Sequence, residues 1–255
     1  MSKKKHIAMI SGGRDSSAMV IYMLENGMEL DHIIFTDTLH EFPFMYDYIK
    51  KFNKFLNKTY GKHIEILTPK DSFKHWVFGK VTRGERKGMI RGLPMITVVC
   101  FWKRQSKVRP FEKFLKDNNI VDYVQYIGYT YSELKRAKVN DMSQQFPLID
   151  AKICEADVDR ILDRVGMVNP LYEHFSRTGC SMCPYQSEKS LYTLWKNYPK
   201  EWKYMKKIEK KLSKLDNVVN RTWKIDKRLK EYEKSFVINA KGLSDVPDKS
   251  CECAI

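Results

Sequence analysis

The first 70 residues alternate between strand-like and helix-like patterns, and this alternation constrains the fold more than any other feature of the chain. Short apolar runs are expected to form strands, and segments with apolar residues every three or four positions are expected to form helices. The strands cover 6–10, 30–35 and 64–67, and the helices cover 15–25 and 44–56. Elements that alternate at this spacing build a parallel sheet with helices on both faces. We therefore predict an α/β fold, with a further strand at 121–127.

Beyond this region the sequence is less regular and more helical. The stretch 69–99 carries four glycines among Lys and Arg residues, which fits either a mobile lid over a site or an ordinary surface excursion. A basic helix is predicted at 101–118, with Pro110 marking a break or a first turn inside it. Helices are also predicted at 155–165 and over most of 193–229.

Length and hydropathy set the expected domains and location. With 255 residues the chain is long enough for one α/β core and a smaller helical part. We predict an α/β domain at 1–150, a helical extension at 151–243 and a flexible tail at 244–255. No apolar run approaches the ~20 residues that cross a bilayer, and no signal-type apolar segment follows Met1. A cytoplasmic location with no membrane partner is therefore the expectation.

The formal net charge of +15 is a strong bias for this length. It favours anionic partners, namely nucleic acid, nucleotides or an acidic protein, unless it only keeps a lysine-rich surface solvated. The segment 196–234 concentrates 14 Lys and Arg residues against six acidic ones. The aromatic residues in or beside it are Trp195, Tyr198, Trp202, Tyr204 and Trp223. This mixture fits a surface that tracks a phosphate backbone and stacks bases, and it also fits an amphipathic helix whose rings face the core.

The segment 11–17, with the sequence SGGRDSS, lies between the first predicted strand and the first predicted helix. Its glycines let the backbone turn sharply and approach an anion, while the first amides of the helix carry partial positive charge. Asp15 would repel a bare phosphate, so its expected role is to hold a magnesium ion beside one. The alternative is an ordinary glycine turn with an Asp or Ser helix cap. The residues expected to contact the anion are Ser11, Gly12, Gly13, Arg14, Ser16 and Ser17.

Five elements in order between about residues 6 and 205 are similar to the motifs of one family. They are SGGRDSS at 11–17, DTLHEFP at 37–43, Cys100 with Arg104, Lys107 and Pro110, Gly128 with Glu133 and Arg136, and RTGCSMCP at 177–184. The sequence resembles the phosphoadenosine phosphosulfate (PAPS) reductase family, which includes phage and mobile-element members. That family lies within the PP-loop ATP pyrophosphatases of the adenine nucleotide α-hydrolase-like superfamily.

The resemblance implies a Rossmann-like, HUP-type parallel sheet and a C-terminal helical extension that carries the CxxC pair. It implies that the loop binds the pyrophosphate of ATP, or PAPS, together with Mg²⁺. It assigns Asp15, Lys107 and Arg136 to catalysis, and Asp37, Thr38, Arg104 and Gly128 to nucleotide binding. Two positions depart from the family pattern. Arg14 stands where Lys is usual, which keeps the charge and changes the geometry, and Leu39 stands where Gly is usual.

The six cysteines are not expected to form a disulfide framework in a reducing compartment. Cys180 and Cys183 form a CxxC, a spacing that lets two thiolates bind one metal ion. The resemblance adds Cys100 as a third ligand and implies a [4Fe–4S] cluster, with zinc as the alternative. A redox-inert pair in the core is the plain interpretation. The fourth ligand position is open or filled by Cys154, Cys251, Cys253 or His174.

Three functions fit these observations. The first is cleavage of ATP between the α- and β-phosphates to activate a substrate, such as tRNA or DNA, for sulfur transfer from a sulfur donor or companion protein. The second is reduction of phosphoadenosine or adenosine phosphosulfate to sulfite. Asp15 and the C-terminal ECAI at 252–255, which lacks the glycine and histidine of the reductase motif, favour the first. The third is a non-catalytic module that binds nucleotide or nucleic acid.

Overall fold

The computed structural model of the chain describes residues 3–95, 100–137, 143–225 and 227–238. The chain forms two compact units, each built from separate stretches of sequence. The first unit comprises Met1–Asp37, Glu41–Thr68 and Pro110–Glu173, and the second comprises Thr38–His40, Pro69–Arg109 and His174–Ile255. The linear domain boundaries at residues 150 and 243 stay a prediction, and the predicted tail at 244–255 lies outside the described residues.

A parallel sheet forms the centre of the first unit. Its strands are β1 (Lys5–Ile10), β2 (His32–Thr36), β3 (Ile64–Leu67), β5 (Tyr123–Ile127) and β6 (Gln144–Gln145). They lie in the order β3-β2-β1-β5-β6, and all neighbouring pairs are parallel. The predicted Rossmann-like α/β fold is confirmed. The chain runs outward from β1 to β3 and then returns to the other side of β1, so the direction of winding reverses between β1 and β5.

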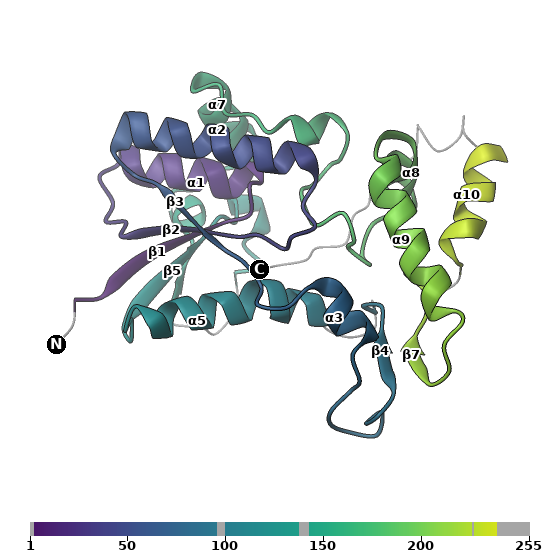
Figure 1. Ribbon diagram of the computed structural model, residues 1–255. Helices are drawn as coiled ribbons and strands as arrows, with labels where there is room; N and C mark the ends of the chain where they lie inside the picture. Colours follow the sequence, from purple (N-terminus) through teal and green to yellow (C-terminus); the bar gives the residue numbers. More distant parts are fainter. Residues whose placement is uncertain (1–2, 96–99, 138–142, 226, 239–255) are drawn as a thin grey trace. The chain divides into compact units, whose positions relative to one another are not determined.

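Helices cover both faces of this sheet. The helices and short helical turns of the first unit are α1 (Arg14–Glu25), α2 (Pro43–Tyr60), α5 (Arg109–Asp117), η2 (Tyr131–Glu133), α6 (Pro147–Asp150), α7 (Glu155–Arg164) and η3 (Pro170–Glu173). Figure 1 shows α1, α2 and α7 on one face and α5 on the other. On the α5 face, Phe111 and Phe114 form a buried cluster with Ile7, Met9 and Ile34. Each such side chain contributes roughly 1.5–3 kcal/mol when it is fully buried.

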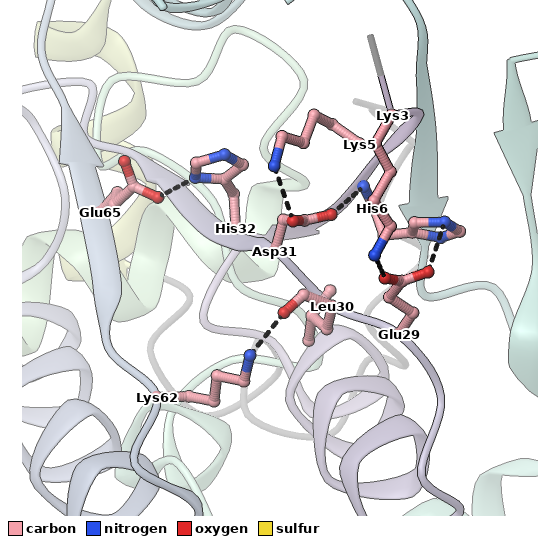
Figure 2. Close-up of polar contacts among 9 residues, drawn as sticks. All are labelled: Lys3, Lys5, His6, Glu29, Leu30, Asp31, His32, Lys62 and Glu65. Atoms are coloured by element: carbon pink, nitrogen blue, oxygen red, sulfur yellow. Dashed lines mark hydrogen bonds and ion pairs between the residues drawn. The ribbon is translucent and has the colours of Figure 1, made fainter. Parts of the chain in front are cut away.

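Polar contacts join the amino ends of the strands (Figure 2). The Asp31 carboxylate accepts hydrogen bonds from the His6 backbone N–H at 2.8 Å and from Lys5 Nζ at 3.0 Å. His32 Nδ1 lies 2.6 Å from Glu65 Oε1, which joins β2 to β3. These contacts help to hold the strand register at one end of the sheet, so the loops that can carry a site are those at the carboxyl ends.

The second unit contains helices and a small sheet. Its elements are α3 (Phe73–Phe78), β4 (Ile90–Gly92), α4 (Phe101–Lys103), η1 (Arg104–Val108), α8 (Glu188–Asn197), α9 (Pro199–Leu212), β7 (Val218–Asn220) and α10 (Leu229–Ile238). Strands β4 and β7 pair in parallel. The buried Glu209 carboxylate of α9 accepts hydrogen bonds from the backbone N–H groups of Trp223 and Leu229, at 3.3 and 2.9 Å. Glu209 therefore holds the segment after β7, which includes Trp223 and Leu229, against α9.

Three expectations for this unit differ from the structure. The described part of 69–99 is not irregular throughout, because it contains α3 and β4. The helix predicted over 101–118 contains the π-helical turn η1, in which the Arg109 N–H donates to the Arg104 carbonyl. This wider turn directly precedes Pro110, which has no N–H for an α-helical ladder. The segment 193–229 includes β7 and a break between α8 and α9, so it is less helical than predicted.

No helix in the described part of the chain combines the length and the apolarity needed to span a bilayer.

Gly92 in β4 occupies a position that only glycine fits. Its φ is 76°, and a Cβ built on it would lie 1.9 Å from the Asn220 carbonyl oxygen in β7. We expect Gly92→Ala to disrupt the pairing of β4 with β7 and to lower the free energy of unfolding by about 2–4 kcal/mol in chemical denaturation.

Gly84→Ala is the matched control. Gly84 has a φ of 77° but no heavy atom within 4 Å of a built Cβ, so we expect a loss of only about 1 kcal/mol. Equal losses in the two variants would show that the backbone conformation, and not the approach to β7, sets the cost.

Candidate functional site

Two neighbouring strands end side by side at the point where the winding of the sheet reverses. β1 ends at Ile10 and continues into the loop 11–17, whereas β5 ends at Ile127 and continues into Gly128. The two strands are parallel neighbours, so their carboxyl ends lie at the same edge of the sheet. Ligands of open α/β sheets bind outside the carboxyl ends of the strands at such a reversal. The fold therefore brings the predicted anion loop and Gly128 together at the expected place.

Side-chain hydroxyls close the loop 11–17 on itself. The Ser11 N–H donates to Ser16 Oγ at 3.2 Å, and Ser16 Oγ donates to the Gly13 carbonyl at 3.2 Å. The Gly13 N–H donates to Ser11 Oγ at 3.3 Å. Ser17 is fully buried. The serines thus hold the shape of the loop, and their predicted contacts with a phosphate stay a prediction.

Two glycines let the loop lie directly against its neighbours. Gly12 has a φ of 74°, and a Cβ on it would lie 2.2 Å from Met45 Sδ. The Gly12 carbonyl accepts a hydrogen bond from Nδ2 of the buried Asn169 at 2.8 Å. A Cβ on Gly128 would lie 2.6 Å from Ser16 Cα. The end of β5 therefore packs on the backbone at the start of α1, and a larger residue at position 128 would push the loop away.

The amino end of α1 presents backbone amides at the loop. The helix begins after Gly13, which provides no side-chain hydrogen bond as a cap. The first N–H groups of a helix have no intrahelical acceptor and lie at the positive end of its dipole, which makes them an anion-binding group. One of them, the Arg14 N–H, donates to the Tyr172 hydroxyl at 3.1 Å.

The Arg14 guanidinium contacts two side chains of the first unit. Arg14 Nη1 lies 3.1 Å from Asp159 Oδ1, and the guanidinium carbon lies 4.5 Å from the centroid of the Tyr172 ring. A planar guanidinium can pair with a carboxylate and stack on a ring at once, which a lysine ammonium does less well. The replacement of the usual lysine therefore has a local explanation in Asp159 and Tyr172.

The surroundings of Asp15, the second residue of α1, disfavour the charged form of its carboxyl group. Burial and then the charge of Glu133 raise the pKa of Asp15 to about 6; Glu155 and Asp159 act in the same direction, and Arg14 opposes them. A cation bound to Asp15 would relieve this repulsion. Magnesium in nucleotide sites needs only one or two carboxylates beside phosphate oxygens. Asp15 therefore fits the role of ligand to a nucleotide-bound Mg²⁺ ion.

Asp37 and Thr38 follow β2 and are both buried. The Asp37 N–H donates to the Leu67 carbonyl at 2.9 Å, and the Asp37 carboxylate accepts a hydrogen bond from the Tyr46 hydroxyl at 3.0 Å. Leu39, which stands where the family pattern has glycine, has a φ of 58°. The backbone keeps the left-handed conformation that glycine would adopt, and Leu39 carries the steric cost.

The Gly128–Arg136 element forms one local structure after β5. Glu133 accepts a hydrogen bond from the Thr130 N–H at 3.3 Å and forms an ion pair with Arg136. The Arg136 guanidinium lies 4.5 Å from the centroid of the Tyr129 ring. Glu133 is also the carboxylate that repels Asp15 most strongly. The assignment of Arg136 to phosphate contact stays a prediction.

The remaining predicted site residues belong to the second unit: Arg104, Lys107, Cys100, Cys180 and Cys183. Arg104 is exposed, and Lys107 and the three cysteines are half-buried. Among the described residues, no group of three or more His, Cys, Asp or Glu side chains is placed to hold a metal ion. The ligand set Cys100, Cys180 and Cys183 therefore stays a prediction. Two of the possible fourth ligands, Cys251 and Cys253, lie outside the described residues.

The aromatic residues of the basic segment 196–234 and its flank are mainly interior. Tyr198, Trp202 and Trp223 are 6%, 2% and 2% exposed. The structure favours the amphipathic-helix interpretation for these three rings, which are not available to stack on bases.

Four residues at the site were not found from the sequence: Glu155, Asp159, Asn169 and Tyr172. They act on a loop about 140 to 160 positions earlier in the chain, and no local motif connects them to it. The only sequence signal is the spacing of Glu155 and Asp159, which places two acids on one face of α7.

The raised pKa of Asp15 predicts a gain in stability when its charge is removed. A carboxyl whose folded-state pKa is raised contributes stability that is fully present below its ordinary pKa, near 4, and is lost as the pH rises through about 6. We expect Asp15→Asn to be more stable than the wild type by about 1–3 kcal/mol at pH 8 without nucleotide or Mg²⁺, and equally stable near pH 4. Denaturant unfolding at both pH values measures this. Asp122→Asn, at the amino end of β5, is the control, and a gain of the same size there would contradict the account.

The left-handed backbone at Leu39 predicts a second stabilising variant. Leu39 is 45% exposed, so removal of its side chain forfeits only part of the burial of a leucine, and Leu39→Ala measures that loss. We expect Leu39→Gly to raise the free energy of unfolding by about 0.5–1 kcal/mol, because glycine relieves the steric cost. Leu39→Ala keeps the Cβ and should show no gain. Thermal or chemical unfolding separates the two, and a gain in the alanine variant alone would refute the explanation.

A comparison with known protein families gives one match. Residues 5–186 match the family model described as the phosphoadenosine phosphosulfate reductase domain. No curated protein matches the sequence at a significant level.

Two solved structures are similar at low identity. A phosphoadenylyl-sulfate (PAPS) reductase from Candida auris, solved as a phosphate complex, aligns with a TM-score of 0.46 and 18% identity, over 68% of this chain and 78% of that one. The U34-tRNA thiolase NcsA from Methanococcus maripaludis, solved with its [4Fe-4S] cluster, aligns with a TM-score of 0.37 and 14% identity, over 98% of this chain and 84% of that one. Likenesses at this level carry no inference about substrate or cofactor.

Proposed function

The chain belongs to the phosphoadenosine phosphosulfate reductase family, and we propose that it binds ATP through the loop 11–17 and cleaves it between the α- and β-phosphates. In this reaction an acceptor takes the adenylyl group, and pyrophosphate leaves. The activated acceptor is then ready for sulfur transfer, with the sulfur supplied by a donor or companion protein. The family assignment does not specify the nucleotide, and the proposal goes beyond it by naming ATP.

The observation that carries the proposal is the loop between β1 and α1. It lies at the carboxyl end of a central strand, beside the end of β5, and its shape is held by Asn169, Ser16 and the close approach of Gly128. A loop held in this way presents the amides of α1 without reorganisation. Preorganised donors stabilise the charge that develops on a departing pyrophosphate.

Asp15 is the residue that favours ATP over a simpler anion. Its charge is disfavoured in the unliganded protein, and a magnesium ion bound with the phosphates would compensate it. The ion would supply charge neutralisation on the pyrophosphate leaving group. Lys107, Arg104 and Arg136 are proposed to add positive charge, but only Arg136 lies in the same unit as the loop. No step is assigned to an iron–sulfur cluster, because the three cysteines do not form a ligand group among the described residues.

A second candidate is the reduction of PAPS to sulfite. The family description favours this reaction by name. Asp15 counts against it, because a sulfonucleotide reductase releases no pyrophosphate and has less use for a magnesium-holding carboxylate in the loop.

The decisive measurement uses nucleotide binding and product analysis together. We expect Mg²⁺·α,β-methylene-ATP to bind the wild type in calorimetry, and Asp15→Ala to weaken this binding by at least about tenfold, because the magnesium ligand is lost. Asp122→Ala, at the opposite end of the strands, should bind as the wild type does. Asp15→Ala binding as tightly as the wild type would refute the proposal.

The two candidate reactions differ in their products. With ATP and an adenylyl acceptor the first releases pyrophosphate, whereas with PAPS and a thiol reductant the second releases sulfite. Sulfite without pyrophosphate would replace the first candidate by the second. Neither product would favour a non-catalytic nucleotide-binding module.

A further inference from the structure

The positive charge of the chain lies in the second unit. That unit contains 29 Lys and Arg residues against 12 Asp and Glu residues, a formal charge of +17. The first unit contains 17 basic and 19 acidic residues, a formal charge of −2. A proteome-wide preference for lysine would raise the charge of both units. The imbalance therefore favours an anionic partner for the second unit in addition to the nucleotide proposed for the first unit.

An ordered hairpin presents part of this charge. Its arms are joined by an antiparallel bridge between Lys80 and Ile90, and the Val81 N–H donates to the Met89 carbonyl at 2.8 Å. The hairpin leads directly into β4, which pairs with β7 (Figure 1). The turn 82–88 is closed by backbone hydrogen bonds, including Lys87 N–H to Gly84 O at 3.0 Å. The hairpin is thus a fixed projection of the second unit.

The turn 82–88 has an exposed positive surface. All seven of its residues are exposed, and they include Arg83, Arg86 and Lys87 against one acid, Glu85. Within the described part of the chain, no ion pair involves these three basic side chains. Three cations on one turn repel each other, and among the described residues no ion pair offsets this repulsion, although Glu85 lies in the same turn.

Two more guanidinium groups converge at the base of the hairpin. The guanidinium carbons of Arg91 and Arg109 lie 5.3 and 5.4 Å from the centroid of the Trp76 ring. Arg91 Nε is buried without a hydrogen-bond acceptor among the described residues. Burial and the charge of Arg109 both lower the pKa of Arg91. An anion that contacts the exposed Arg109 would offset the positive charge of this pair.

Helix α9 carries further exposed positive charge in the same unit. Its exposed lysines, with the one just beyond its end, are Lys200, Lys203, Lys207, Lys210, Lys211 and Lys214. Trp202 on this helix is buried and Tyr204 is half-buried, so α9 offers charge with little aromatic surface for stacking. A chain of phosphates satisfies such a surface, whereas a small anion would occupy only one point of it.

We propose that the second unit binds a polynucleotide through its phosphodiester backbone, with the hairpin 79–91, Arg109 and the lysine face of α9 as the contact surface. Contact with the backbone is independent of base sequence, which agrees with the burial of Tyr198, Trp202 and Trp223. Binding of the polynucleotide needs no ATP and is therefore independent of the proposed function. Only the further step, that the polynucleotide is the acceptor, rests on the proposed function.

The test is fluorescence polarisation with labelled single-stranded RNA, single-stranded DNA and duplex DNA of one sequence, at about 50 to 300 mM KCl. Each phosphate contact adds about 0.7 to the slope of log K against log salt for single strands. The variant Arg83→Gln/Arg86→Gln/Lys87→Gln should therefore lower the slope by about 2 and the affinity by about 10- to 100-fold at 100 mM salt. The preferred probe identifies the source of the phosphodiester.

The matched control removes three charges from the first unit. Lys50, Lys54 and Lys58 are exposed along α2, and their triple change to Gln should leave the affinity and the slope unchanged. The proposal is wrong if wild type binds none of the probes at the lowest salt, if the hairpin variant binds as wild type does, or if the α2 variant loses as much. Equally tight binding of polyglutamate would also overturn it, because the surface would then fit an acidic protein.

A further variant separates this proposal from the proposed function. Asp15→Ala should lose nucleotide binding and keep polynucleotide binding, because the two activities lie in different units. If the wild type binds a polynucleotide but never releases pyrophosphate from ATP, the proposed function fails and the binding surface stands. The polynucleotide would then not be the acceptor of an adenylyl group.

Discussion

The close approach of two backbones supports the whole candidate site. The end of β5 contacts the first turn of α1 at a distance that only glycine at position 128 permits. This contact fixes the start of α1 relative to the sheet, and Asn169 holds the preceding Gly12 carbonyl from the other end of the first unit's sequence. The amides at the start of the helix are therefore already oriented before any anion arrives, and little of its binding energy is lost in ordering the loop.

The same arrangement leaves an unfavourable charge beside those amides. Asp15 lies near Glu133, Glu155 and Asp159, and Arg14 only partly offsets the repulsion. A protein selected for stability alone would not keep an acid there. An unfavourable charge of this kind is typical of a group that becomes favourable only when its partner binds.

The two units of the chain differ strongly in net charge. The first unit, which carries the loop, is nearly neutral, whereas the second unit holds the entire positive excess. Such a division fits a small ligand, recognised by backbone amides in one unit, and an extended anionic ligand, attracted by surface charge in the other. In the second unit the buried Trp202 of α9 and the pairing of β4 with β7 support the elements that carry this charge.

The sequence by itself determined the parallel α/β fold, the position of the glycine loop between β1 and α1, and the family, because each follows from local patterns: the spacing of apolar residues, the glycines of SGGRDSS and the short motifs after the strands. It did not reveal β4, β7 or the π-helical turn at 104–108, since these depend on pairing and packing with distant segments. Tertiary structure alone decided which side chains surround Asp15, which acceptor satisfies Arg14, and that Trp202 and Trp223 are core residues. The physical reason is that burial and the repulsion between carboxylates depend on distances in space, and Glu155, Asp159 and Tyr172 come near the loop only when α7 and η3 pack beside α1.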